Sequence, residues 1–274
     1  MKLSVSARIA EGFLSKKEAI MTLPRLADLA VSAGFEGLCM RASQIGVHTP
    51  SDEVREAAET LRSRDLQVTM ISGDFDIVYN NADGPNCLRN ISPYLDLAQT
   101  LGAPLIRVCI KARDDIVAAQ RAADEAAERG LRLVHQCHVQ SLFETVDEII
   151  TRLAEIDREN FGLIFEAANL EECRQDYGSD TIRRFGESIF NVYLQNQLIQ
   201  PDGAVTLDTW NHGPITFDII EIPDTRGIDF PRVFEGLHAI GYQGTVTVHQ
   251  SAPEDGSSPA ESARKTADYL RTLI

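Results

Sequence analysis

The sequence predicts an α/β protein with a single (β/α)8 TIM barrel over residues 1–274. Eight short apolar runs, rich in Val, Ile, Leu and Phe, alternate along the chain with stretches of helical length. Most of these runs stop abruptly at polar side chains, and no linker divides the chain into two halves. A chain of 274 residues suits one such barrel, since the fold commonly takes about 250 residues.

Four strand–helix units are predicted in the first half of the chain. We expect the strands at residues 3–6, 35–40, 66–71 and 105–110. We expect the helices that follow them at residues 17–33, 51–64, 88–101 and 114–129. Apolar residues recur at helical spacing in these segments, and Gly34, Gly102 and Gly130 stand where three of the helices should end. Residues 72–86 are predicted to form an unusually long polar loop.

The clearest unit spans residues 131–169, where apolar runs at 131–138 and 161–169 flank a helix at 143–158. Each run is too short for a helix of its own. A strand–helix–strand unit of this length returns as a right-handed crossover with parallel strands. The polar residues that end the two runs therefore emerge at one edge of the sheet, which in a closed parallel barrel is the face that binds ligands.

The last third of the chain completes the pattern and contains one long excursion. The remaining elements are expected as a helix at 170–187, a strand at 189–194, a helix at 229–240, a strand at 245–248 and a helix at 259–273. Residues 197–227 separate two of these elements and include alternating apolar residues. A connection of this length indicates a functional loop or a small hairpin of its own.

Composition and missing motifs exclude several classes of function. The chain has 26 Lys and Arg against 41 Asp and Glu, a formal charge of −15, and no basic run, so we expect no nucleic-acid partner. No apolar stretch approaches the roughly 18 residues of a membrane span, and no signal peptide is recognisable. Five cysteines without CxxC spacing favour reduced, buried thiols in a cytoplasmic protein. No glycine-rich phosphate loop follows a strand, so we expect no nucleotide cofactor, and no GxSxG elbow indicates a serine hydrolase.

The candidate catalytic residues are Glu166, His138 and His249, which stand at the ends of predicted strands six, five and eight. A carboxylate with two imidazoles can hold Zn, Mn or Fe, and the same groups can pass protons without a metal. The sequence leaves both interpretations open. Each residue also has a structural explanation, as a helix cap, a rim histidine or a partner of Arg107. Their joint occurrence on the ligand-binding face favours the functional one.

Further polar residues at the same face are predicted to bind substrate. Amide side chains suit hydroxyl groups, and two cations could meet an anionic substituent. The amides are Gln136, Asn169, Gln195 and Asn196, and the cations are Arg41 and Lys111. Trp210 and His212, in the long excursion, could close over a ligand, although a solvated loop with one anchoring aromatic explains them nearly as well.

Several segments resemble the sugar phosphate isomerase/epimerase family with the xylose isomerase-like barrel. These are residues 34–38 (GFEGL), 136–138 (QCH), 163–170 (LIFEAANL), 226–230 (RGIDF) and 241–248 (GYQGTVTV). Together with the order of elements, the resemblance covers nearly the whole chain. It implies an isomerase, an epimerase or a related lyase that acts on a small sugar, keto-sugar or polyol, and it leaves a homo-oligomer open.

The resemblance also implies one divalent metal, held by Glu, Asp, His and Glu at the ends of strands five to eight. Those positions fall here on Gln136, Glu166, Tyr193 and His249, so only Glu166 keeps a carboxylate. We therefore expect an atypical site, in which Glu166, His249 and Gln136 would hold Zn, Mn or Fe, or in which protons move without a metal.

Two alternatives to a sugar-converting enzyme follow from the same residues. The barrel could bind a sugar-like ligand or a partner without turning anything over, its metal site having been lost. An endonuclease like the DNA-repair members of this barrel type is disfavoured by the charge of −15 and by the missing His/Glu cluster.

Overall fold

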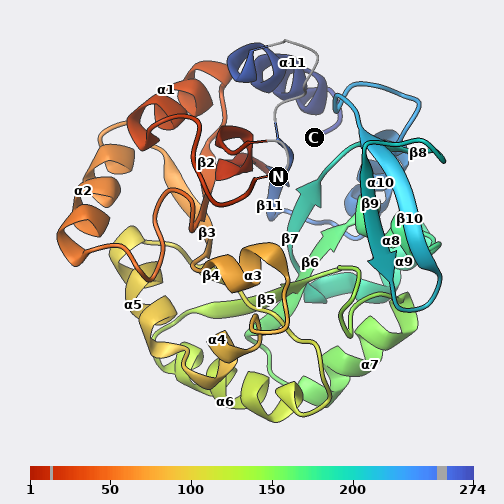
Figure 1. The fold of residues 1–274 in the computed structure, drawn as a ribbon, viewed down its shortest axis with the longest axis horizontal. Coiled ribbons are helices and arrows are strands. Elements are labelled where there is room, and N and C mark those ends of the chain that lie inside the picture. The colour runs from red at the N-terminus through yellow and green to blue at the C-terminus, as the bar shows by residue number, and fades with distance from the viewer. Residues whose placement is uncertain (13–14, 252–257) are drawn as a thin grey trace.

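The structure is a computed structural model that describes residues 1–12, 15–251 and 258–274, and it shows a closed parallel barrel inside a ring of helices (Figure 1). The barrel strands are β1 (Lys2–Ser6), β2 (Gly37–Arg41), β3 (Gln67–Ser72), β4 (Leu105–Arg107), β5 (Arg132–Gln136), β6 (Phe161–Glu166), β7 (Ile189–Leu194) and β11 (Thr245–Val248). They pair in chain order, and β11 closes the barrel between β7 and β1. The predicted (β/α)8 barrel is confirmed.

The outer ring covers the barrel with the apolar faces of its helices. The longer helices are α1 (Leu23–Ala33), α2 (Ser51–Arg62), α5 (Ser92–Leu101), α6 (Asp115–Glu128), α7 (Val146–Ile156), α9 (Ser179–Phe185), α10 (Phe230–Ala239) and α11 (Pro259–Arg271). Short helical turns lie at η1 (Ala7–Ala10), α3 (Phe75–Tyr79), α4 (Asn86–Arg89), α8 (Ala167–Glu172) and η2 (Gly186–Ser188). Gly34 and Gly102 end α1 and α5 as predicted, since both take the left-handed conformation that glycine adopts without strain.

Side chains inside the barrel form an apolar layer with a polar layer above it. The apolar layer consists of Cys39, Met70, Leu105, Val134, Ile164 and Tyr193. Side chains two positions apart point to the same side of a strand. The polar layer is therefore formed by the residues two positions further along each strand, toward its C-terminal end. These residues are Arg41, Ser72, Arg107, Gln136, Glu166 and Gln195. The barrel therefore presents polar groups at the C-terminal ends of its strands.

The excursion after β7 contains a small antiparallel sheet, as the second of the two sequence interpretations expected. Its strands are β8 (Gln197–Ile199), β9 (Val205–Thr209) and β10 (Gly213–Ile219), in the order β8-β10-β9. In Figure 1 this sheet stands beside the barrel mouth, outside the ring of barrel strands.

Several predicted boundaries were wrong. The helix expected at 88–101 is divided into α4 and α5, and α3 lies within the loop expected at 72–86. The first long helix begins at Leu23 rather than residue 17, because Pro24 lies in the first turn, where proline favours helix initiation. Strand four ends at Arg107 rather than residue 110, and beyond that end the thiol of Cys109 contacts Asn80 in the connection after β3. The helix expected at 170–187 is divided into α8 and α9.

Two expectations about the rest of the chain can be compared with the structure. All five cysteines are buried as free thiols. Within the described residues, no helix is long and apolar enough to cross a membrane.

Candidate active site

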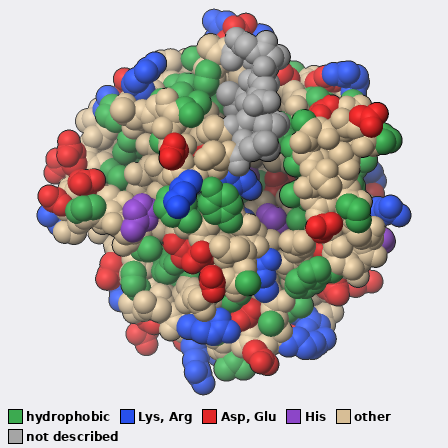
Figure 2. Space-filling model, in the orientation of Figure 1, with side chains coloured by type: hydrophobic (Ala, Val, Ile, Leu, Met, Phe, Trp, Pro, Cys, Tyr) green, Lys and Arg blue, Asp and Glu red, His purple; other side chains and the backbone are tan. Residues whose placement is uncertain are grey.

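A cavity of about 400 Å³ lies at the C-terminal ends of the barrel strands. We call it the polar pocket, and the predicted residues that line it are Gln136, His138, Glu166, Asn169, Gln195 and His249. The surface is hollowed near the centre of this face, where histidine and basic side chains are visible (Figure 2). The structure thus gathers all three candidate catalytic residues around one cavity.

Glu166 ends β6 and is only 1% exposed. Its Oε2 accepts hydrogen bonds from the amide nitrogens of Gln136 and Asn169, the latter at 2.6 Å. Burial raises the pKa of Glu166 to about 7, although these amides and the charges of Arg107 and Lys16 act in the opposite direction. No hydrogen bond to Oε1 is found within the described part of the chain, so this oxygen can accept a proton.

A second carboxyl group lines the polar pocket and was not predicted. Glu172, on α8, is 1% exposed, and its Oε2 has no hydrogen-bond partner among the described residues. Burial, followed by repulsion from Glu166 and Glu171, raises the pKa of Glu172 well above its usual value. Two carboxyl groups with different proton affinities therefore face one cavity. No sequence pattern distinguishes Glu172, because it lies in a helix, where acidic residues are common.

The environment of the two histidines of the polar pocket favours their uncharged form. Burial, reinforced by the arginines around the site, holds the pKa of His249 and of His138 well below the usual range. His249 stacks on Tyr193 with ring centroids 3.9 Å apart, and its Nδ1 lies 3.1 Å from Ser6 Oγ. His138 Nδ1 lies 2.9 Å from the carbonyl oxygen of Val139. The same Nδ1 lies 3.1 Å from Nδ2 of Asn80, which also donates to the carbonyl oxygen of Val139.

Three cations line the polar pocket, namely Arg8, Lys16 and Arg107, and none was predicted as a site residue. Arg107 is 3% exposed and points inward from β4. An arginine in an otherwise apolar strand is the signal that could have identified it. Arg8 follows β1 directly, whereas Lys16 lies in a loop with no pattern.

Three residues predicted to bind substrate have structural partners and do not line the polar pocket. Arg41 is buried and forms a bidentate ion pair with Glu11, with distances of 2.8 and 3.1 Å. Lys111 Nζ donates to the carbonyl oxygen of Gln140 at 2.8 Å. Asn196 is fully buried, and its amide holds the backbone of the loop that precedes α10. Each of these side chains is therefore held by a partner within the protein, although Arg41 Nη1 has no hydrogen-bond partner among the described residues.

The small sheet closes one side of the polar pocket, but not through the predicted aromatic residue. Val205 and Leu207 of β9, with Phe217 and Ile219 of β10, supply an apolar wall. Trp210 and His212 lie in the turn between these strands, are both exposed, and do not line the cavity.

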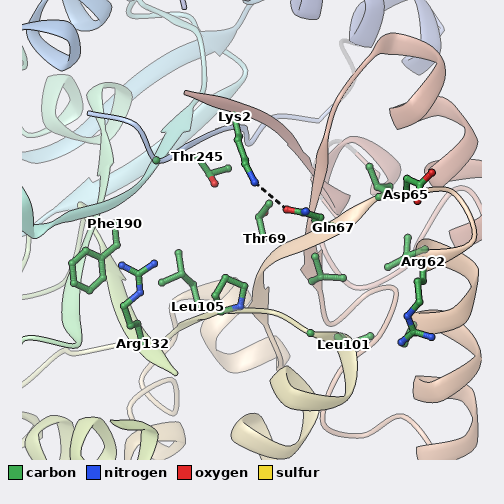
Figure 3. Close-up of a pocket in the computed structure, with 17 residues that line it drawn as sticks. Lys2, Arg62, Asp65, Gln67, Thr69, Leu101, Leu105, Arg132, Phe190 and Thr245 are labelled. Atoms are coloured by element: carbon green, nitrogen blue, oxygen red, sulfur yellow. Dashed lines mark hydrogen bonds between the residues drawn. The ribbon is translucent and has the colours of Figure 1, made fainter. Parts of the chain in front are cut away.

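A larger hollow, of about 730 Å³, opens at the opposite, N-terminal end of the barrel. In Figure 3 the side chain of Lys2 reaches toward Gln67, with a hydrogen bond of 3.3 Å. Arg132 lies against the ring of Phe190, with its guanidinium carbon 4.7 Å from the ring centroid. Although this hollow is the larger, it lacks the buried carboxyl and imidazole groups of the polar pocket, and residues at this end of a barrel usually serve stability.

The residues around the polar pocket do not fit a divalent metal ion. Among the described residues, no three His, Cys, Asp or Glu side chains lie close enough together to hold one. Gln136 turns its amide nitrogen toward Glu166, and Arg107 and Lys16 place positive charge beside that carboxylate. A metal ion requires converging oxygen or nitrogen lone pairs, whereas this site offers hydrogen-bond donors and cations. The expected set of Glu166, His249 and Gln136 is therefore assembled around the cavity but not arranged for a metal.

Comparison with known proteins places the chain among barrels of related sequence and shape. It is 26% identical over 152 residues to inosose dehydratase from Geobacillus thermodenitrificans, a match that covers 55% of this chain and 51% of the relative. The chain thus spans about half the length of the curated relatives it matches.

Two solved structures share the fold over nearly the whole chain. The probable 3-DHS dehydratase AsbF from Bacillus anthracis superposes with a TM-score of 0.71 at 14% identity, covering 99% of both chains. The IOLI protein, whose crystal structure holds a zinc atom, has a TM-score of 0.71 at 14% identity and covers 100% of this chain and 98% of its own. The family described as the xylose isomerase-like TIM barrel matches residues 27–273, and this chain belongs to that family.

Proposed function

We propose that the protein is an enzyme that removes a proton from the carbon next to a carbonyl group in a small polyhydroxylated compound. It would act as a sugar isomerase, an epimerase or a lyase that eliminates water. The supporting observation is Glu166, a buried carboxyl group with a free oxygen facing the polar pocket and a pKa raised to about 7. A base of this pKa is both substantially ionised near neutral pH and strong enough to accept a carbon-bound proton.

The surrounding groups supply the other parts of such a reaction. Gln136 and Asn169 fix Glu166 through Oε2, leaving Oε1 to take the proton. The bonding electrons of the broken C–H bond move to the carbonyl oxygen and form an enediolate. Glu172, whose protonated form is favoured by burial, returns a proton to carbon or to a departing hydroxyl group. Gln136 Oε1, buried without a partner among the described residues, accepts from a substrate hydroxyl.

The relatives support a reaction of this class. The names inosose dehydratase and probable 3-DHS dehydratase both describe removal of water, which in a hydroxy-carbonyl compound begins at the carbon beside the carbonyl. Proton abstraction is also the step shared with isomerisation and epimerisation.

The site carries a second candidate function, a barrel that binds a sugar-like ligand without converting it. The observation in its favour is that the residues at the expected metal positions do not fit a metal ion. Binding without proton exchange would identify this alternative.

Proton exchange in D2O tests the proposal even when the product is unidentified. A panel of keto-sugars and cyclic polyhydroxy ketones is incubated with the protein and followed by ¹H NMR for loss of the signal beside the carbonyl. We expect exchange with at least one compound, rising with pH and levelling above about 7 as Glu166 ionises. Chelation with EDTA should leave the rate unchanged.

The decisive variant is Glu166→Gln, which keeps the size of the side chain but removes the base. Its exchange rate should fall by roughly 10²- to 10⁴-fold, the usual contribution of general base catalysis. Glu128→Gln, at an exposed carboxylate of α6 outside the polar pocket, is the matched control. Full activity in Glu166→Gln would exclude Glu166 as the base.

A further inference from the structure

The polar pocket contains more positive charge than the protein itself neutralises. Arg107 forms no hydrogen bond or ion pair with any described residue, and its Nε is completely buried. Lys16 lines the same cavity and likewise has no hydrogen-bond or ion-pair partner in the described segments. A buried cation without a counter-ion is strongly unfavourable, so proteins rarely keep one unless a ligand completes it.

The nearby carboxyl groups do not balance these cations. Glu11 is committed to Arg41 in a bidentate ion pair. Burial favours the protonated form of Glu172, and Glu166, with a pKa of about 7, is only partly ionised near neutral pH and supplies at most one negative charge beside the two cations. Burial, followed by repulsion from the surrounding arginines, lowers the pKa of Lys16 to about 7, so positive charge dominates its surroundings.

We propose that Arg107 and Lys16 bind a compact oxyanion, a carboxylate or a phosphate, carried by the polyhydroxylated substrate. The inference rests on the proposed function, because it names the class of compound that enters the same pocket. Arg107 presents its guanidinium from a rigid barrel strand, and a planar guanidinium matches the two oxygens of either group. Arg107 is close enough to Glu166 for its charge to act on that carboxyl group, so an anion held by Arg107 would bring the carbonyl part of the same ligand toward Glu166.

Isothermal titration with three probes tests the proposal. The probes are D-fructose, which is neutral, 2-keto-D-gluconate, which carries a carboxylate, and D-fructose 6-phosphate, which carries a phosphate. We expect one anionic probe to bind at least about tenfold more tightly than fructose, the usual effect of a charge-assisted hydrogen bond. Preference for the keto acid or for the phosphate ester identifies the anion, and equal affinity for all three would overturn the proposal.

Variants assign the preference to Arg107. Arg107→Met should reduce the affinity for the preferred anion to that for fructose, and Arg107→Lys should retain part of the preference. Arg113→Met, at a side chain that is 73% exposed, is the control and should bind as the wild type does. If Arg107→Met lowers the affinity for fructose and for the anionic probe by the same factor, Arg107 does not recognise the anion and the proposal is wrong.

Thermal melting without ligand separates a binding role from a structural one. Removing an uncompensated buried charge should leave the melting temperature of Arg107→Met unchanged or raise it. A marked fall in the melting temperature would show that Arg107 makes stabilising interactions within the ligand-free protein, and it would overturn the proposal.

The titration does not depend on turnover, so the two proposals fail separately. Anion preference without proton exchange would contradict the proposed reaction only. Proton exchange with neutral sugars and no anion preference would contradict the anion site only.

Discussion

Two adjacent amides after β7, Gln195 and Asn196, have different roles because they point in opposite directions. Gln195 lies two places beyond Tyr193 and therefore points into the barrel, where it lines the polar pocket. Asn196 points the other way and is fully buried. Its Nδ2 donates to the carbonyl oxygens of Glu221 and Asp224, both at 2.8 Å, and its Oδ1 accepts from the backbone nitrogen of Ile228. Asn196 therefore holds the backbone that leads into α10.

This difference predicts opposite effects for two similar substitutions. Asn196→Ala leaves several buried backbone groups without partners and should lower the free energy of unfolding by roughly 2–4 kcal/mol. Gln195→Ala, its matched control, should change that free energy by less than about 1 kcal/mol while weakening ligand binding. Chemical denaturation measures both. Equal destabilisation would contradict the structural role assigned to Asn196.

At the scale of elements, one buried carboxylate ties the β9–β10 turn of the small sheet to the barrel. Glu144, in the loop between β5 and α7, is 1% exposed. It accepts hydrogen bonds from the backbone nitrogens of Gln140 at 2.6 Å, Trp210 at 2.7 Å and Asn211 at 3.2 Å. These bonds tie the β9–β10 turn to the loop after β5, so the apolar wall of the polar pocket is fixed at its far end.

Glu144→Ala should release this turn without unfolding the barrel. We expect faster amide hydrogen exchange across residues 205–217 and weaker ligand binding, because the wall formed by Val205 and Leu207 loses its anchor. Hydrogen exchange measured by mass spectrometry gives the first result and titration the second. Asp208→Ala, an exposed carboxylate of β9, is the control. Unchanged exchange in the turn of Glu144→Ala would show that other contacts hold the sheet.

The site residues that the sequence could identify are those that stand at the ends of apolar strands. Glu166, Gln136 and His249 were found because each follows an apolar strand, and strand order alone brings their ends together. Arg107 was missed because the fourth strand was extended to residue 110, which moved the predicted exit to Lys111. Arg41 was placed correctly at a strand end, but its charge is satisfied by Glu11, a partner 30 positions away that no local pattern reveals. Fold follows from local periodicity, whereas charge pairing depends on contacts across the barrel.

At the scale of the whole molecule, an acidic protein encloses a cationic pocket. The formal charge is −15, yet Arg8, Lys16 and Arg107 meet at the barrel mouth. Physiological salt screens exposed charges beyond roughly 8 Å, whereas buried charges are screened much less. The field that a ligand meets inside the pocket is therefore set by these cations rather than by the net charge of the surface.

The free energy of unfolding should depend on pH because the buried carboxyl group of Glu166 ionises. Glu166 has a folded-state pKa of about 7, above the value of 4.5 for an unperturbed side chain. The stabilisation that its protonation provides is fully present below pH 4.5 and is lost as the pH rises through about 7. Relative to Glu166→Gln, the wild type should therefore lose roughly 3 kcal/mol of unfolding free energy across this window. Denaturant titrations at intervals from pH 4 to pH 8 measure this loss, with Glu128→Gln as the control. A difference in unfolding free energy between the wild type and Glu166→Gln that stays constant with pH would contradict a raised pKa.

The spacing of two residues between the apolar and polar layers of the barrel has an evolutionary consequence. Val134 and Ile164 provide packing, while Gln136 and Glu166, two residues further along the same strands, line the polar pocket. A single codon change in the upper layer can therefore alter specificity without disturbing the layer beneath it. Pocket residues can therefore be substituted one strand at a time while the packed layer is kept, which offers a direct route to redesigning the selectivity of the pocket.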